Sequence, residues 1–217
     1  MNQIYILALL FAVASANLGA DVSYYSAGRT TFTCLAQQNV TLTILQIWDE
    51  TGTVNKDFLT NYIYSRDAQI PGFDALVMVN DTFAAEDLCN GVARALPTHF
   101  NGTVWLNVQN KQGLWSRDTD ERISYLESVA KTCQQHGLNP GVYSSTDVWA
   151  TVMGSQGTGS DTLSALPVWY FNDNNVQSFD DFSYAGFGTW ENPQMKNYGT
   201  NTYLCGSYIT SLDYYEN

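Results

Sequence analysis

Short apolar runs separated by amphipathic stretches constrain the fold of this chain more than any other feature. Apolar, β-branched-rich runs occupy residues 42–48, 76–79, 104–108, 141–143 and 167–171. They are too short for core helices and show little polar alternation, which is typical of strands buried on both faces. Buried strands of this kind belong to parallel sheets covered by helices.

The intervening stretches have helical periodicity. Apolar side chains recur at spacings of three and four over residues 57–69, 84–96 and 119–136, and a shorter helix is expected over 147–153. Thr119 or Asp120 could cap the third helix, and Gly137 would end it. The alternation predicts an α/β chain that closes as an irregular single-domain (β/α) TIM-like barrel of about eight strands. The segment after Phe171 is expected to be loop-rich.

The first residues have the composition of a signal peptide. An apolar run over residues 4–13 is followed by the small residues Ala14, Ser15 and Ala16. We therefore expect a signal peptide over 1–16 and one barrel domain over 17–217. The protein would be secreted and extracellular, or held in the lumen of a lysosome, phagosome or secretory granule.

The charge balance excludes some classes of partner. The chain has 9 basic and 21 acidic residues, for a net charge of −12. Such a surface argues against nucleic-acid binding and against electrostatic docking on anionic bacterial walls. No phosphate loop, nucleophile elbow or metal-ligand spacing is present, so no cofactor or metal is expected. The sequence predicts no oligomeric state.

Four cysteines follow the predicted signal peptide, which suggests two disulfides. Cys89 and Cys133 fall on consecutive predicted helices, which are neighbours in a barrel. Cys34 follows the first strand and Cys205 precedes the last, and barrel closure brings those strands together. Of three possible connectivities, we expect Cys34–Cys205 and Cys89–Cys133.

Three Asn-X-Thr sequons begin at Asn39, Asn80 and Asn101. Each is a possible glycan acceptor if it is exposed. Such triplets also arise by chance in a chain rich in Thr, so we expect one or two to be used.

An ordered set of short motifs resembles the family 25 glycoside hydrolases, and in particular the small secreted lysozymes of nematodes and amoebae. The match begins at Ala20-Asp21-Val22-Ser23 and covers nearly all of the mature chain. Any one motif is weak evidence, but the whole set of motifs in the same order is strong evidence for the resemblance. The other motifs are Thr33-Cys34-Leu35, residues 102–106, 141–145, Met153-Gly154, 167–170, 179–182, 193–198 and Cys205-Gly206.

The resemblance implies a (β/α) barrel that hydrolyses the link between N-acetylmuramic acid and N-acetylglucosamine in peptidoglycan. It also implies carboxylates at strand ends, and Asp21 matches the first. The acidic pair that should close strand 4, with Glu as proton donor, is replaced by Asn107 and Gln109. A last-strand Asp should fall near 210 or 211, where neither residue is acidic. Asp213 is close but resembles a neighbouring family position.

These replacements bear directly on proton transfer. Glycoside hydrolysis normally needs a carboxylic acid to protonate the leaving oxygen, and a carboxamide has no transferable proton in this range. We therefore expect a lysozyme-like protein with impaired catalysis that keeps glycan binding or a structural role. The alternative is an active lysozyme for digestion or defence with relocated acids. Candidates for such acids are Asp49, Glu50 and Asp173, which are otherwise ordinary loop carboxylates.

Aromatic residues at strand ends could stack on sugar rings. Such residues are equally often packing residues of the barrel, so each has both interpretations. The candidates for binding a peptidoglycan or another N-acetylated glycan are Trp48, Tyr143, Trp169, Tyr170 and Tyr198.

Overall fold

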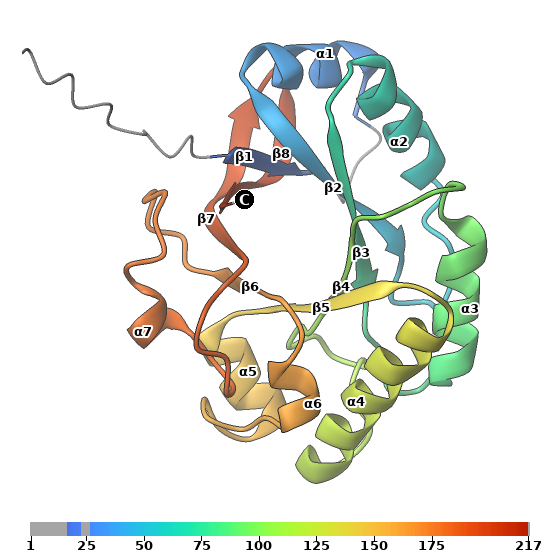
Figure 1. Ribbon diagram of the computed structural model, residues 1–217, viewed down its shortest axis with the longest axis vertical. Helices are drawn as coiled ribbons and strands as arrows, with labels where there is room; N and C mark the ends of the chain where they lie inside the picture. The colour runs from blue at the N-terminus through green and yellow to red at the C-terminus, as the bar shows by residue number, and fades with distance from the viewer. Residues whose placement is uncertain (1–16, 23–26, 217) are drawn as a thin grey trace, which may run out of the picture.

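The computed structural model describes residues 17–22 and 27–216, and the predicted signal peptide over 1–16 lies outside this part. Eight strands close into a barrel with helices around it (Figure 1), which confirms the predicted fold class. In chain order the elements are β1 (Asn17–Asp21), α1 (Arg29–Gln37), β2 (Val40–Trp48), α2 (Phe58–Asp67), β3 (Gly72–Met78), α3 (Ala85–Ala95), β4 (Thr103–Asn107), α4 (Thr119–Gln135), β5 (Asn139–Ser144), α5 (Thr146–Met153), α6 (Asp161–Ser164), β6 (Val168–Phe171), α7 (Phe182–Ala185), β7 (Met195–Leu204) and β8 (Ser207–Tyr215).

The last strand departs from the expected parallel sheet. Strands β1 to β7 pair in parallel in chain order, whereas β8 runs antiparallel to both β7 and β1. Leu204 pairs with Ser207, so Cys205 and Gly206 alone form the turn, with φ angles of 56° and 72°. A two-residue turn of this kind forms a hairpin and is too short for a parallel crossover.

The expectation of a loop-rich end was therefore wrong for residues 195–215. The segment is rich in Gly, Asn and Tyr, which obscured its strand character. Its strands are long because they pair with each other as well as with the barrel.

Helices α1 to α6 cover the outside of strands β1 to β6, and the short α7 lies on the side of β6 and β7 (Figure 1). The main core fills the space between the sheet and these helices. Helix α4 is capped by Asp118, whose side chain accepts a hydrogen bond from the Glu121 amide, rather than by Thr119 or Asp120. Gly137 follows α4 with a φ of 77°, as its predicted role as a helix stop requires.

A second, smaller core fills the interior of the barrel. Trp169 lies at its centre, with its ring stacked on Tyr143 at 3.8 Å between centroids and edge-on to Trp105 at 5.7 Å. Close aromatic packing of this kind fills the barrel interior around Trp169, so that no channel runs through this part of the described structure. The buried members of this core are Leu42, Ile44, Leu76, Trp105, Tyr143, Trp169 and Met195.

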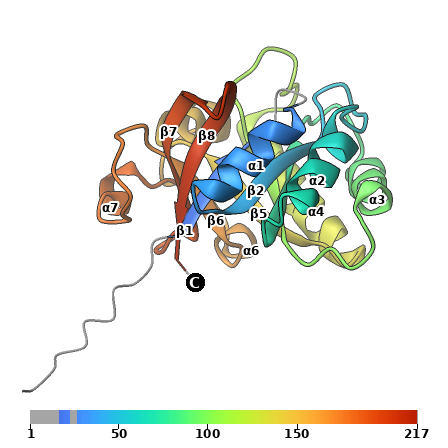
Figure 2. The same ribbon diagram turned by 90° about the horizontal axis from the view of Figure 1, so that it is seen from above.

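Both predicted disulfides are confirmed. Cys89 joins α3 to Cys133 of α4, and Cys34 joins α1 to Cys205 in the β7–β8 turn. Figure 2 shows α1 beside this hairpin, so the second bond fixes the tip of the closing strands to the helix layer. No helix within the described residues is long and apolar enough to span a bilayer.

Removal of the Cys34–Cys205 bond by Cys34→Ala with Cys205→Ala is expected to lower the unfolding free energy by about 5 kcal/mol, because the bond closes a long loop. Hydrogen exchange should show lost protection over residues 195–215. The matched variant Cys89→Ala with Cys133→Ala should lose about 4 kcal/mol and keep protection in the hairpin. Equal hairpin protection in both variants would contradict the anchoring role.

Candidate functional site

The carboxyl ends of the parallel strands meet at one mouth of the barrel, which is where barrels of this kind hold their sites. Asp21 is the last residue of β1 and Asn107 is the last residue of β4. Both side chains are buried, with exposed fractions of 3% and 2%. The structure thus brings two of the predicted site residues to the same end of the barrel.

The strand-4 amides form a local hydrogen-bonded pair. Gln109 donates from Nε2 to Asn107 Oδ1 at 2.7 Å, and Asn107 donates from Nδ2 to the sulfur of Met78 at 3.2 Å. Trp115 Nε1 donates to the Gln109 carbonyl oxygen at 2.8 Å, which holds the segment after β4 in place. These amides supply hydrogen-bond donors and acceptors but no carboxyl proton.

Asp213 is a buried carboxyl of the barrel interior whose burial the sequence did not predict. It lies on β8 opposite Gly19 of β1, is fully buried, and accepts hydrogen bonds from the Ser211 hydroxyl at 3.2 and 3.3 Å. Burial raises the pKa of Asp213 well above its usual value, and the charge of Asp21 raises this pKa further. The signal available in the sequence was its spacing of two from the expected acidic position at 211.

Tyr143 and Trp169 lie inside the barrel rather than on an open face. Trp169 is fully buried, and the Tyr143 hydroxyl accepts a hydrogen bond from Asn197 Nδ2 at 2.9 Å. Tyr198 is also buried, and its hydroxyl accepts from Gln177 Nε2 at 2.9 Å. Of these three, Tyr143 lies beside the strand-4 amides, because it pairs with Asn107 across the sheet.

Trp48 and Tyr170, which were predicted to line a sugar groove, both pack in the core between the sheet and the helices. A register shift near the end of β2 turns Trp48 outward, where its ring meets Gly91 of α3 so closely that any Cβ there would clash. Tyr170 follows the inward-facing Trp169, so it points outward into the helix-side core.

A polar hollow lies at the rim of the mouth. Its volume is about 530 Å³, and Glu50 of the β2–α2 loop forms an ion pair there with Lys111 of the segment after β4. Most of the lining residues carry hydroxyl, amide or charged groups, which can bind a polar ligand. The lining residues are Gln46, Asp49, Glu50, Thr51, Thr53, Val54, Asn55, Lys56, Asp57 and Lys111.

The family model described as lysozyme-like protein 1 matches residues 12–198. The chain is 30% identical over 202 residues to "Probable GH family 25 lysozyme 4" of Dictyostelium discoideum, covering 91% of this chain and 90% of that relative. This chain belongs to the family 25 lysozyme-like proteins. It is also 28% identical over 191 residues to "Counting factor 50" of the same organism, covering 85% of this chain and 60% of the relative.

Solved structures agree on the fold. A family GH25 lysozyme from Aspergillus fumigatus superposes with a TM-score of 0.69 at 12% identity, over 94% of this chain and 95% of that one. The barrel of the family is therefore retained at low sequence identity. In this chain the β4 positions expected to be acidic hold amides, and β8 carries a buried carboxyl.

The three sequons lie in different surroundings. Asn39 and Asn101 are exposed and precede β2 and β4, at the amino end of the barrel. Asn80 is buried, and its Nδ2 donates to the Glu50 carbonyl oxygen at 2.9 Å. A glycan at Asn80 would have to displace this bond.

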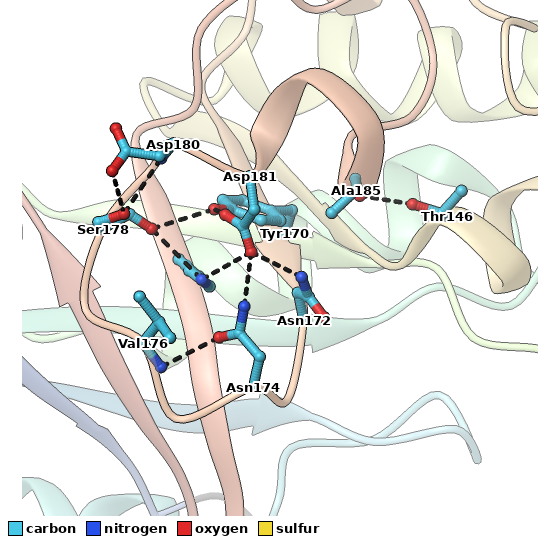
Figure 3. A network of polar contacts seen from close by, with 10 residues as sticks. Thr146, Tyr170, Asn172, Asn174, Val176, Ser178, Asp180, Asp181 and Ala185 are labelled. Atoms are coloured by element: carbon cyan, nitrogen blue, oxygen red, sulfur yellow. Dashed lines mark hydrogen bonds and ion pairs between the residues drawn. The ribbon is translucent and has the colours of Figure 1, made fainter.

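A buried ion pair fixes the wall between β6 and β7. Lys196 of β7 has no exposed surface, and its Nζ donates to Asp181 at 2.8 Å and to the Ser178 carbonyl oxygen at 3.3 Å. Asp181 also accepts bonds from Tyr170, Asn172 and Asn174 (Figure 3). The carboxylate thus gathers donors from β6, from the following loop and from β7.

The hydrogen bonds that Asp181 accepts lower its pKa by more than burial raises it. Burial alone would raise the pKa of Asp181, but donation from Lys196, Tyr170 and Asn172 holds this pKa below its usual value. Burial and the bond to Asp181 raise the pKa of Tyr170. The network therefore stays an ionised carboxylate surrounded by donors, which holds residues 172–181 beside the mouth.

Lys196→Met is expected to lower the unfolding free energy by about 3–5 kcal/mol, because it leaves the Asp181 carboxylate buried without its cation. Lys131→Met is the matched control, since Lys131 pairs with Glu127 on the exposed face of α4. The control should lose less than about 1 kcal/mol. Denaturant titrations check both, and equal small losses would contradict a stabilising role for the buried pair.

Proposed function

We propose that this chain is a lysozyme-like protein that binds peptidoglycan or a related N-acetylated glycan and cleaves it weakly or not at all. The observation that carries the proposal is the hydrogen-bonded pair of amides, Asn107 and Gln109, at the end of β4. Membership of the lysozyme-like family supports the choice of glycan. The polar rim of the mouth supports binding of a sugar rich in hydroxyl and amide groups.

The end of β4 holds amides where glycoside hydrolysis would need a carboxylic acid. Gln109 can donate a hydrogen bond to a glycosidic oxygen, but it cannot transfer a proton to that oxygen. Loss of general acid catalysis costs roughly 10²–10⁴ in rate. Asn and Gln also preserve the shape of Asp and Glu, so the mouth can keep its form while losing charge.

Contacts in the structure argue against the relocated acids of the alternative hypothesis. Asp49 accepts hydrogen bonds from the amides and hydroxyls of Thr51 and Thr53 and so stabilises its own loop. Glu50 is engaged with Lys111, and Asp173 accepts from Thr200 Oγ1 at 2.6 Å. Each of these three carboxylates is therefore already engaged by a hydrogen bond or an ion pair.

We also propose that the protein is secreted or held in the lumen of a secretory organelle. Two disulfides are typical of oxidising compartments such as the extracellular space and the lumen of secretory organelles. We propose Asn39 and Asn101 as glycan acceptors, because both are exposed and lie at the end of the barrel opposite the mouth. Glycans there would leave a ligand at the mouth unobstructed.

The double variant Asn107→Asp with Gln109→Glu is expected to raise peptidoglycan clearance by at least about 10²-fold, because it restores a carboxylic acid beside the preserved barrel mouth. The matched control is Asn110→Asp with Gln112→Glu, which makes the same charge change at exposed positions. The control should clear no more than the wild type. Gln109→Glu alone serves if the double variant does not fold.

Wild-type clearance comparable to that of an active lysozyme would overturn the impaired-catalysis proposal. Glycan binding is tested separately by co-sedimentation of the wild type with insoluble peptidoglycan and with chitin. Retention on either supports the binding role. Failure on both leaves a structural role for the barrel.

A further inference from the structure

The interior of the barrel contains a carboxyl group that has no evident function in the strand-4 chemistry. Asp213 of β8 lies opposite Gly19 on one side and opposite Asn197 on the other. A Cβ at position 19 would lie 3.1 Å from the Asp213 Cβ, so the glycine gives this side chain its space. Asp213 is fully buried, which makes its charged form costly.

The groups around Asp213 do not supply a compensating positive charge. Asp21 lies on the same face of β1, two residues from Gly19, and adds a negative charge. On β7, Tyr198 is the titratable neighbour, and its own pKa is raised by burial and by the charge of Asp213. Within the described ranges, the ion pairs of the chain involve other carboxylates.

On β7, opposite Asp213, the side-chain oxygen of Asn197 has no hydrogen-bond donor in the described structure. Asn197 is buried and donates through Nδ2 to the Tyr143 hydroxyl, but its Oδ1 has no hydrogen-bond partner in the described structure. Paired residues in adjacent antiparallel strands have Cβ atoms about 5 Å apart, so the two side chains are neighbours. A neutral carboxylic acid at 213 can donate its O–H to Asn197 Oδ1, whereas a carboxylate cannot.

We propose that Asp213 is a neutral carboxylic acid at neutral pH, donates its proton to Asn197, and thereby positions Tyr143 beside the strand-4 amides. The role is one of positioning, because Asp213 has no exposed surface through which to touch a glycan. Its effect on a ligand runs through Asn197 to Tyr143, which pairs with Asn107. The ligand part of this inference rests on the proposed glycan binding.

The stability of the protein should depend on pH, because the folded state holds a proton on Asp213 that the unfolded chain releases. Burial and the Asp21 charge raise the pKa of Asp213 in the folded protein. Its contribution to stability is therefore most favourable at acid pH and is lost as pH rises through the folded pKa. Asp74 acts in the same direction at the other end of the barrel, because burial raises its pKa to about 6.

The variant Asp213→Asn distinguishes the pH dependence due to Asp213 from that due to Asp74. It mimics the neutral acid in shape and leaves Asp74 unchanged. In the wild type labelled with ¹³C at the Asp carboxyl carbon, one resonance that Asp213→Asn removes should titrate well above the ordinary Asp range. The variant should also lose less thermal stability than the wild type between mildly acidic and mildly alkaline pH. Asp173→Asn, at an exposed loop position, should change neither result.

Titration of the Asp213 resonance in the ordinary Asp range would overturn the proposal. If Asp213→Asn does not fold, the same wild-type resonance can be identified through Asp21→Asn, which removes a neighbouring charge and should lower its midpoint. An unchanged set of midpoints in Asp21→Asn would contradict the assignment.

Co-sedimentation with insoluble peptidoglycan tests the positioning role. Wild-type retention should weaken at alkaline pH, while Asp213→Asn should retain the glycan equally at both pH values. Equal pH dependence in both proteins would contradict positioning by Asp213. If neither protein is retained at any pH, the proposed glycan binding fails, and the carboxyl titration still decides whether Asp213 holds the proton.

Discussion

Closure of the barrel by β8 is the constraint on which the rest of the structure depends. This strand enters between β7 and β1 in the antiparallel sense, through a two-residue turn that a disulfide ties to α1. Closure places Asp213 beside Gly19 and opposite Asn197, although these residues are far apart in sequence. Without β8, the mouth would lack one wall, and the inner faces of β1 and β7 would be exposed.

Amide, carboxyl and charged groups occupy different strands of the closed barrel. Amides occupy the end of β4, where the family resemblance implies acids, and a buried carboxyl occupies β8. Lys196, which is fully buried, neutralises Asp181 on the outer side of β7. The end of β4 thus offers hydrogen-bond donors and acceptors from Asn107 and Gln109 in place of carboxyl groups.

Sequence reasoning predicted the barrel, its main strands and helices, and both disulfides, because these depend on periodicity and chain order. It did not predict side-chain directions that depend on local register. Trp48 and Tyr170 have the composition of sugar-stacking residues, but a register shift and strict alternation turn them outward. Lys196 and Asp213 gave no sequence signal of burial, because both sit in a segment whose Gly, Asn and Tyr content resembles a loop.

We propose that this chain keeps the lysozyme architecture and has lost proton transfer at β4. The most direct measurement is the release of new reducing ends from purified peptidoglycan by the wild type, compared with an Asp21→Ala variant. The account predicts that the wild type releases reducing ends at least about 10²-fold more slowly than an active lysozyme, and that Asp21→Ala releases no more than the wild type. Release by the wild type at a rate comparable to that of an active lysozyme, abolished by Asp21→Ala, would contradict it.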